Sequence, residues 1–484
     1  MSKKIKDLAA VIGSRLCLQV SALVIVPIAA RTMEPREFGA WSLILVFTGF
    51  IGLFVDSGFG SYVIREQCYT SDVRATMFWL SLSLGGGLSI VAALLSPLIA
   101  ILLGIEDWLP AILIVVGSLV PQNLATVALA ELRKTLRFGC LFWVDLSCSS
   151  LTTVVAGLLF VGGWGLYSYA ITFAVVALIR CLWSYGVVGF PKGSFDRDIA
   201  KAAFKYTWGL VGFNAVNYWA RRFDNVLIGR VWGPAELGPY SIAYRLMMLP
   251  ISEINRTLLG LIFPYLVPNQ HRPEKVRSDL TFALKMIGAL VTPAMTILWI
   301  ARRPLVEIYL GPGWDAVADL LGVFALLGLL QSLVNPVGIA YKVSGNTALF
   351  FRMGMLNTCV SIMAMLIGVK FGVYGLAVAC GIVSTIMTYP NVEVAFRCVG
   401  GGFKEWWRAI GAWWIVPLSS ALTCRALPIT DFSAITYIIA CAGVVVLASM
   451  AVLFAFYRPV VRRIAHELKS LRRRKIPAPK GEFA

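Results

Sequence analysis

Six charged side chains lie inside two long apolar segments of the chain. The segments cover residues 206–229 and 238–266, and each is long enough to cross a bilayer as a helix. A charge at the centre of a bilayer costs roughly 2.5–3.5 kcal/mol on insertion scales. These side chains are therefore expected to face protein or a water-filled cavity. They are Arg221, Arg222, Asp224, Arg245, Glu253 and Arg256.

Residue spacing in the first segment predicts a polar face on one helix. Asn214, Asn217, Arg221 and Asp224 are separated by three, four and three positions, and residues three or four apart lie on the same side of an α-helix. Such a face on a membrane-spanning helix usually borders protein or water. Arg221 and Asp224 are also close enough along the helix to pair with each other.

The second segment carries a similar polar face. Arg245, Ser252 and Arg256 are separated by seven and four positions, and Glu253 lies three positions before Arg256, within pairing distance. Only a short turn, residues 233–238, separates the two segments. The two helices are therefore expected to stand side by side, and their polar faces could line one surface.

Two interpretations fit these intramembrane charges. Arginine stays charged, and its planar guanidinium binds phosphate oxygens through paired hydrogen bonds, so an arginine-lined cavity would hold a phosphate-bearing ligand. Alternatively, the charges form ion pairs that hold neighbouring helices together. We favour the cavity for the arginines. For Asp224 and Glu253 both interpretations stay open, because a carboxylate beside an arginine can simply be its partner.

Two further polar residues lie in the N-terminal part of the chain. Arg15, one helical turn before Gln19, could line the same cavity or extend to the inner headgroups. Asp56 is followed by Gly58 and Gly60, so it could cap or bend a helix end, or act as a carboxylate that binds and releases protons. The candidates for coupling to an ion are therefore Asp56, Asp224 and Glu253.

The composition is that of an integral membrane protein. Of 484 residues, 58% are hydrophobic and 14% are charged, whereas soluble domains carry about 25% charged residues. Mean hydropathy is +0.79. The net charge of +18 would suggest nucleic acid in a soluble protein. Here the basic residues are spread over short loops and one tail, which favours anionic membrane lipid as a partner and argues against nucleic acid.

Metal, disulfide and nucleotide sites are not indicated by the sequence. The ten cysteines include no CxxC pair, and His271 and His466 are far apart. No GxxxxGK[ST] motif is present. We therefore expect no metal, no cofactor and no ATP hydrolysis. The basic N-terminus leads into an expected span, which does not resemble a cleavable signal peptide.

A span needs about 20 apolar residues, and the chain offers about fourteen such segments. We therefore expect an all-α polytopic membrane protein with two six-helix lobes around a central cavity and two additional C-terminal helices. The expected parts are an N-terminal lobe (1–189), a cytoplasmic inter-lobe loop (190–205), a C-terminal lobe (206–396), two further helices (397–457) and a basic tail (458–484). The expected spans are Ala9–Ala30, Phe38–Val63, Met77–Leu103, Leu109–Ala130, Cys140–Val161, Leu166–Val188, Tyr206–Gly229, Gly238–Leu266, Leu280–Ala301, Ala316–Tyr341, Met353–Val369, Val373–Phe396, Ala409–Leu427 and Phe432–Tyr457.

Loop charge predicts the orientation. Lysine and arginine concentrate in the even-numbered loops and at both ends of the chain. Because positive residues stay on the cytoplasmic side, both termini are expected to be cytoplasmic. The tail after Arg458 has apolar residues at helical spacing among basic ones, which fits either a helix lying on the inner leaflet or a disordered segment.

The charged segments belong to a longer sequence pattern. Its centre is FDNVLIGRVWGPAELGPYSIAYR at 223–245, followed by Pro250 and Phe263-Pro264. Its other parts are Arg31 to Gly39, DSGFG at 56–60, YLGPGWD at 309–315, QSLVN at 331–335 and Ser344-Gly345. This pattern resembles the polysaccharide-transporter family, the Wzx-type branch of the multidrug/oligosaccharidyl-lipid/polysaccharide (MOP) superfamily. Within that family it is most similar to the colanic-acid and teichuronic-acid exporters.

The resemblance implies a flippase, not an enzyme. Such a protein moves undecaprenyl-diphosphate-linked oligosaccharide repeat units to the outer leaflet of the bacterial inner membrane by alternating access, for surface polysaccharide biosynthesis. A lipid-linked oligosaccharide and the polysaccharide polymerase and chain-length machinery are the implied partners. Family cavities are often cationic, and Asp224 and Asn225 match the motif. The substrate-binding candidates are therefore Arg15, Arg221, Arg222, Asp224, Asn225, Arg245 and Arg256.

Other functions compete with this one. The same superfamily contains peptidoglycan lipid-precursor flippases and cation-coupled drug exporters. A membrane glycan polymerase or ligase is disfavoured, because such an enzyme usually has large outer loops that carry catalytic residues, and the expected outer loops are short.

Overall fold

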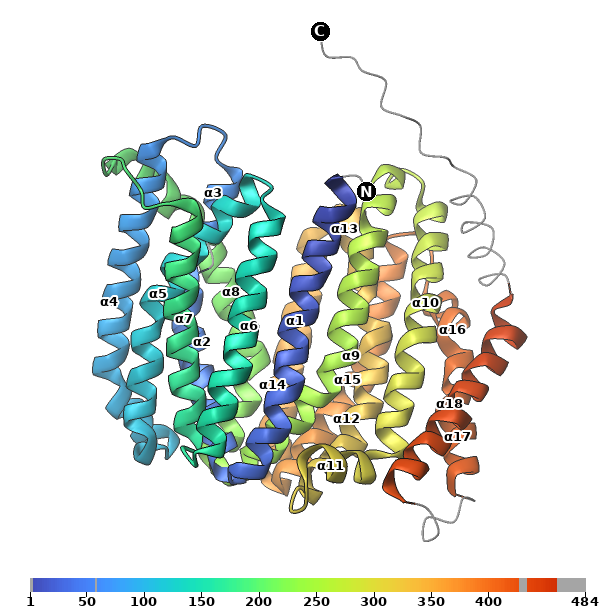
Figure 1. Ribbon diagram of the computed structural model, residues 1–484. Coiled ribbons are helices and arrows are strands. Elements are labelled where there is room, and N and C mark those ends of the chain that lie inside the picture. Colours follow the sequence, from blue (N-terminus) through green and yellow to red (C-terminus); the bar gives the residue numbers. More distant parts are fainter. Residues whose placement is uncertain (1–2, 57–58, 426–432, 459–484) are drawn as a thin grey trace. The chain divides into compact units, whose positions relative to one another are not determined.

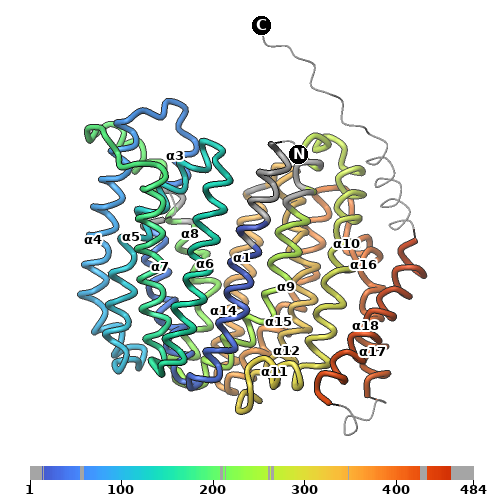
Figure 2. The backbone as a smooth tube through the Cα atoms, in the orientation of Figure 1, coloured from blue at the N-terminus to red at the C-terminus, as the bar shows by residue number. Residues whose placement is uncertain are grey.

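The computed structural model describes residues 3–56, 59–425 and 433–458 (Figures 1 and 2). Every regular element in these ranges is a helix. Nine helical segments of the described chain are long and apolar enough to cross a membrane. The predicted fold class, an all-α polytopic membrane protein, is confirmed.

The chain divides into two compact units. The N-terminal unit comprises residues Met1–Ser241, Tyr309–Trp314 and Val369–Val373, and the C-terminal unit comprises Ile242–Ile308, Asp315–Gly368 and Tyr374–Ala484. The first helices are α1 (Lys3–Thr32), α2 (Pro35–Asp56), α3 (Phe59–Arg65), α4 (Ser71–Leu103), η1 (Glu106–Trp108), α5 (Leu109–Lys134), α6 (Phe138–Val161), α7 (Leu166–Val188), α8 (Arg197–Val231) and α9 (Pro234–Leu266).

The remaining helices follow in the second half of the chain. They are η2 (Val267–Asn269), α10 (Pro273–Ile300), α11 (Arg302–Leu310), α12 (Asp315–Val334), η3 (Asn335–Val337), α13 (Gly338–Val343), α14 (Thr347–Gly368), η4 (Val369–Phe371), α15 (Gly372–Arg397), α16 (Phe403–Ile410), η5 (Gly411–Trp414), α17 (Ile415–Arg425) and α18 (Ala434–Phe456).

Helix ends follow local capping chemistry. The Thr70 side chain accepts a hydrogen bond from the N–H of Val73 at the start of α4, and the Asp196 side chain accepts from Asp198 and Ile199 at the start of α8. Helix α4 ends at Gly104, whose φ of 65° is in the left-handed region. Because Asp196 caps it, helix α8 begins at Arg197, and residues 189–196 connect it to α7. Residues 197–205 of the expected inter-lobe loop (190–205) are therefore helical.

The N-terminal unit is built from paired helices and closed by segments from later in the chain. Within it α5 packs against α4 and α7, α1 against α6, and α2 against α8. The Tyr309 hydroxyl donates to the Leu23 carbonyl at 2.8 Å. The indole N–H of Trp314 donates to Ala30 at 3.0 Å, and that of Trp232 donates to Val369 at 2.9 Å.

Helix α10 is the centre of packing in the C-terminal unit, where it contacts α12, α16, α17 and α18. Two of the expected spans are interrupted here. The segment 316–341 is divided into α12, η3 and α13 at Asn335-Pro336, and 409–427 is divided into η5 and α17 after the end of α16. Proline lacks the N–H that would continue an α-helix, which accounts for the first interruption.

Glycine allows the beginnings of α2 and α9 to touch backbone to backbone. A Cβ atom on Gly39 would overlap the carbonyl group of Pro234, and one on Gly238 would overlap the carbonyl group of Pro35. Both contacts lie in the N-terminal unit. Since each involves a rigid main-chain atom, a side chain at either glycine would push the two helices apart.

We predict that Gly39→Ala and Gly238→Ala each lower the stability of the protein by about 3 kcal/mol, because overpacking against backbone cannot be relieved by a rotamer change. The melting temperature of the purified protein in detergent measures this. Gly52→Ala in the same helix α2 is the control, since its added Cβ would meet open space. Equal melting temperatures for Gly39→Ala and Gly52→Ala would contradict the prediction.

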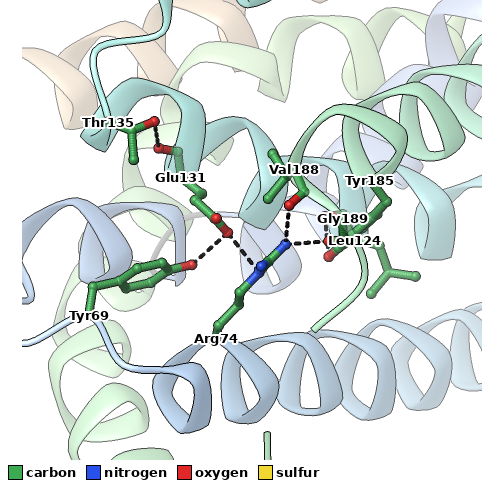
Figure 3. A network of polar contacts seen from close by, with 8 residues as sticks. All are labelled: Tyr69, Arg74, Leu124, Glu131, Thr135, Tyr185, Val188 and Gly189. Carbon is green, nitrogen blue, oxygen red and sulfur yellow. Dashed lines mark hydrogen bonds and ion pairs between the residues drawn. The ribbon is translucent and has the colours of Figure 1, made fainter. Parts of the chain in front are cut away.

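A polar network joins four segments at one end of the N-terminal unit (Figure 3). Arg74 of α4 forms an ion pair with Glu131 of α5, with its Nε atom 3.0 Å from Oε2. Its guanidinium also donates to the carbonyls of Val188, at 2.9 Å, and Gly189. The Tyr69 hydroxyl donates to the same Glu131 carboxylate at 2.9 Å. Burial, and then the neighbouring carboxylate, raise the pKa of Tyr69, so the phenol stays protonated as the donor.

The connection between α7 and α8 is held at the same end of the unit. The N–H of Ser194 donates to the Asp72 carboxylate at 2.9 Å, and the N–H of Asp196 donates to the Thr76 hydroxyl at 2.9 Å. A Cβ on Gly193 would overlap the Ser71 carbonyl group. Residues 189–196 are thus fixed to the first turns of α4.

Arg74→Gln is predicted to destabilise the protein by about 3 kcal/mol, because it leaves a largely buried carboxylate without its cation. The two side chains of this pair are only 21% and 15% exposed. Arg36→Gln is the matched control: it breaks the Arg36–Asp107 pair, whose side chains are 53% and 68% exposed, and should cost at most about 1 kcal/mol. Thermal unfolding of both variants measures the two losses of stability. A larger loss of stability for Arg36→Gln than for Arg74→Gln would contradict the prediction.

Candidate functional site

Asp224 is a buried carboxylate with defined hydrogen-bond donors. Only 6% of this α8 residue is exposed. The Tyr240 hydroxyl donates to Oδ2 at 2.8 Å, and the N–H of Asn225 donates to Oδ1 at 2.8 Å. Tyr240 belongs to α9, so this contact fixes the start of α9 against the end of α8. Asn225 is also buried, at 7% exposure.

The predicted pairing of Arg221 with Asp224 is wrong. No ion pair of Asp224 is present among the described side chains, and the Arg221 Nε atom instead lies 3.4 Å from Oδ1 of Asn217. The physical reason is that Asp224 is buried against Tyr240, whereas Arg221 is exposed. The carboxylate is thus satisfied by a hydroxyl of the next helix.

The exposed face of α8 carries two cationic groups that belong to no described ion pair. Arg221 and Arg222 are both exposed, as is Asn217, whereas Asn214 is half-buried. Within the described residues neither arginine forms an ion pair within 4.0 Å of a carboxylate oxygen. Their guanidinium groups are therefore available to a ligand.

Helix α8 is attached to α2 by the residues beside these arginines. The Tyr218 hydroxyl donates to the Val46 carbonyl at 2.7 Å. The Trp219 ring lies 5.1 Å from the ring of Phe50. A Cβ on Gly229 would come within 2.7 Å of the Leu43 side chain. These contacts hold α8 so that Arg221 and Arg222 stay on its exposed face.

Helix α9 carries the second polar set. The predicted Glu253–Arg256 pair is confirmed, with Arg256 Nη1 3.6 Å from Glu253 Oε1. The arginine side chain is still 58% exposed. Arg245 is exposed as well, and no described carboxylate lies within ion-pair distance of it. Arg245, Glu253 and Arg256 belong to the C-terminal unit, and Arg221 and Arg222 to the N-terminal unit, so a surface shared by both sets stays a prediction.

Asn255 was not identified from the sequence. It is 8% exposed, and its amide oxygen accepts no hydrogen bond from the described residues. A buried polar atom without a partner costs about 1–3 kcal/mol, so such a group usually has a role. The sequence feature that could have identified Asn255 is its position as a polar amide in an apolar segment, between Glu253 and Arg256.

The structure gives no side-chain position for two candidates. Arg15 lies in α1 and Asp56 ends α2, but both side chains lie outside the described residues. Their roles therefore stay predictions. Among the described residues, no group of three or more His, Cys, Asp or Glu side chains is arranged to hold a metal ion.

The sequence has relatives in polysaccharide biosynthesis. Residues 28–319 match the model of a family described as "Polysaccharide biosynthesis protein". The lipopolysaccharide biosynthesis protein WzxC of Escherichia coli is 24% identical over 401 residues, which cover 79% of each chain. The succinoglycan biosynthesis transport protein ExoT of Rhizobium meliloti is 26% identical over 65% of this chain and 63% of its own length. The teichuronic acid biosynthesis protein TuaB of Bacillus subtilis is 24% identical over 70% of this chain and 71% of its own length.

Solved structures show the same fold. The lipid II flippase MurJ in an inward closed conformation superposes with a TM-score of 0.77 at 16% identity, covering 94% of this chain and 100% of that one. An inward-facing multidrug resistance MATE transporter of the MOP superfamily superposes with a TM-score of 0.63 at 16% identity, over 79% of this chain and 94% of that one. The match to the family model over residues 28–319 confirms the predicted family resemblance.

Tyr240→Phe is predicted to destabilise the protein by about 1–3 kcal/mol, because it removes a donor from a buried carboxylate. Tyr374→Phe, at a tyrosine that is 54% exposed, is the control and should leave the melting temperature unchanged. When Asp224 is already replaced by Asn, Tyr240→Phe should cause a smaller loss of stability, since the two residues interact directly. Additive losses in the double variant would show that the hydroxyl and the carboxylate are not coupled.

Proposed function

Because the chain belongs to the polysaccharide biosynthesis protein family, we propose that it flips undecaprenyl-diphosphate-linked oligosaccharide repeat units across the bacterial inner membrane. The protein is a multi-pass membrane transporter of the MOP superfamily rather than an enzyme. The observation that carries the proposal is the family match over residues 28–319, on a fold that superposes on a lipid flippase over 94% of the chain.

The proposed substrate contact is between arginines and the diphosphate. A diphosphate carries several negative oxygens, and a guanidinium binds two of them at once. Arg221, Arg222 and Arg245 are exposed side chains within the segments predicted from the sequence to cross the membrane, where a charge is costly unless it meets water, protein or a ligand. Arg256 remains largely exposed beside Glu253. Arg15 completes the proposed set.

Asp224 and Asn225 are proposed to act at the edge of this cationic region. They are buried at the end of α8, and Asp224 accepts the Tyr240 hydroxyl. Protonation of Asp224 would remove its charge and weaken that contact, which makes it a candidate for coupling transport to an ion gradient. Asp56 and Glu253 are the other proposed coupling carboxylates.

Alternating access is proposed to involve the two lobes predicted from the sequence, residues 1–189 and 206–396, joined by residues 190–205, of which 197–205 form the beginning of α8. Residues 397–457 would add two helices, and 458–484 a basic tail. The distribution of lysine and arginine over the loops supports cytoplasmic termini. In this orientation the tail would contact anionic lipid of the inner leaflet, and the product would reach the polysaccharide polymerase and chain-length machinery on the outer side.

A second candidate is another transport activity of the same superfamily. The TM-score of 0.77 to a lipid II flippase supports a peptidoglycan lipid-precursor flippase, and the MATE likeness supports a cation-coupled drug exporter. Sequence relatives named for lipopolysaccharide, succinoglycan and teichuronic acid favour the surface polysaccharide substrate.

The test is deletion of the gene, followed by analysis of surface glycan and of lipid-linked intermediates in each leaflet. Deletion should abolish the glycan and leave lipid-linked repeat units on the cytoplasmic side. Normal glycan after deletion would exclude the proposed substrate class. Rescue of a strain that lacks its peptidoglycan-precursor flippase, or acquired drug resistance, would instead support the second candidate.

Complementation then tests the arginines. Arg221→Ala and Arg245→Ala should each reduce glycan export at least about tenfold, because one lost charge-assisted contact costs about 1.5–3 kcal/mol. Arg230→Ala, an exposed arginine in the last turn of α8, should complement fully. Equal expression of the three variants is required. If Arg221→Ala and Arg245→Ala complement as well as Arg230→Ala, the flippase assignment stands and these arginines are not substrate ligands.

A further inference from the structure

A basic pocket lies at the start of α10. It has a volume of about 610 Å³, and its lining comes from the first turn of α10 and the segment after α15. All of it belongs to the C-terminal unit. None of its lining residues belongs to α8 or α9. The lining residues are Arg272, Pro273, Glu274, Lys275, Arg277, Val399 and Gly400.

Charge in this pocket is predominantly positive. Three cationic side chains and one carboxylate, Glu274, line it. Arg272 and Lys275 are exposed, and Arg277 is half-buried with its guanidinium donating to the Gly400 carbonyl. In the described part of the chain none of the three cations forms an ion pair within 4.0 Å. The N-terminus of the 28-residue helix α10 adds the positive end of its dipole.

Two nearby carboxylates are already engaged by other groups. Glu405 accepts the N–H of Gly402 at 2.8 Å, and backbone hydrogen bonds lower its pKa, so it is ionised and serves as a helix cap. Glu393 accepts the N–H of Phe403 at 2.7 Å and the Nε of Arg397 at 2.7 Å. These contacts leave Arg272 and Lys275 available to an external anion.

The chain next to the pocket has the character of a membrane interface. Helix α16 begins three residues after Gly400 and is amphipathic, with Trp406 buried and Lys404, Trp407 and Arg408 exposed. Trp407 and Tyr389 are 49% and 58% exposed, and both rings contact Phe403. Exposed tryptophan and tyrosine beside basic residues are typical of headgroup depth in a bilayer.

The geometry points to a binding site for the phosphate of an anionic phospholipid headgroup, held by Arg272, Lys275 and Arg277. A lipid is favoured over a soluble phosphate because exposed aromatic rings next to the pocket would contact acyl chains while the cations hold the headgroup. In the orientation proposed above, the connections that contain Arg272 and Gly400 are cytoplasmic, so the headgroup would belong to the inner leaflet. Binding itself does not depend on which substrate the protein transports.

The test is lipid binding to the full-length protein in detergent, measured by native mass spectrometry with added phosphatidylglycerol or phosphatidylcholine. Arg272→Gln/Lys275→Gln is the test variant, since it retains the Arg277–Gly400 contact. Arg133→Gln/Arg137→Gln removes two exposed charges, one from the last turn of α5 and one from the α5–α6 connection, and is the control. We expect phosphatidylglycerol to bind the test variant about 25-fold more weakly than wild type, from about fivefold for each basic residue near an anionic headgroup.

The control variant should retain wild-type binding, and wild type should prefer phosphatidylglycerol to phosphatidylcholine. Equal loss in both double variants, or no preference between the two lipids, would overturn the proposal. A third arm adds inorganic phosphate alone. If phosphate binds wild type as tightly as the lipid does, the pocket is a site for a soluble anion and the lipid assignment is wrong. Melting temperatures of both variants establish that they are folded, and glycan export is measured separately.

Discussion

The close contact between the beginnings of α2 and α9 is the constraint on which the N-terminal unit depends. Gly39 meets the backbone of Pro234, and Gly238 meets the backbone of Pro35. This contact places the first turns of α9 beside the last turns of α8, so that the Tyr240 hydroxyl reaches the buried Asp224 carboxylate. Both glycines and Asp224 lie within the sequence pattern that resembles the family, and the structure gives that pattern a physical meaning. The two glycines allow the backbones of α2 and α9 to approach each other, and the hydrogen bond between Asp224 and Tyr240 fixes the start of α9 against α8.

Charged groups in the two predicted membrane segments, 206–229 and 238–266, fall into two classes. The carboxylate Asp224 has its donors within the protein, and Glu253 has Arg256 beside it. Arg221, Arg222 and Arg245 are exposed. Fixed acids and exposed arginines leave an excess of positive charge at the surface of α8 and α9, which suits a ligand that carries phosphate. The Arg74–Glu131 network shows the opposite arrangement, because there every guanidinium contact is supplied by the protein itself.

The sequence predicts well whatever depends on one helix. Apolar length identifies the nine helical segments of the described chain that could cross a membrane, and three-residue spacing correctly predicts the Glu253–Arg256 pair. Contacts between helices were harder to predict. Arg221 is correctly spaced to pair with Asp224, but the donor to that carboxylate is Tyr240 of the next helix. The Arg74–Glu131 pair and the unsatisfied Asn255 oxygen also depend on packing that no local pattern encodes. Interrupted helices such as 316–341 could have been recognised from Asn335-Pro336.

Residues that complete the N-terminal unit come from far along the chain. Tyr309 and Trp314 bond to carbonyls of α1, and Val369 accepts the indole of Trp232. During synthesis, α1 to α8 are made before these segments. The hydrogen bonds to the Leu23 and Ala30 carbonyls can therefore form only after residues 309 and 314 have been translated. The hydrogen bond from the Trp232 indole can form only after residue 369 has been translated. The N-terminal unit consequently reaches its final form only when about half of the C-terminal unit has also been translated, which couples the biogenesis of the two.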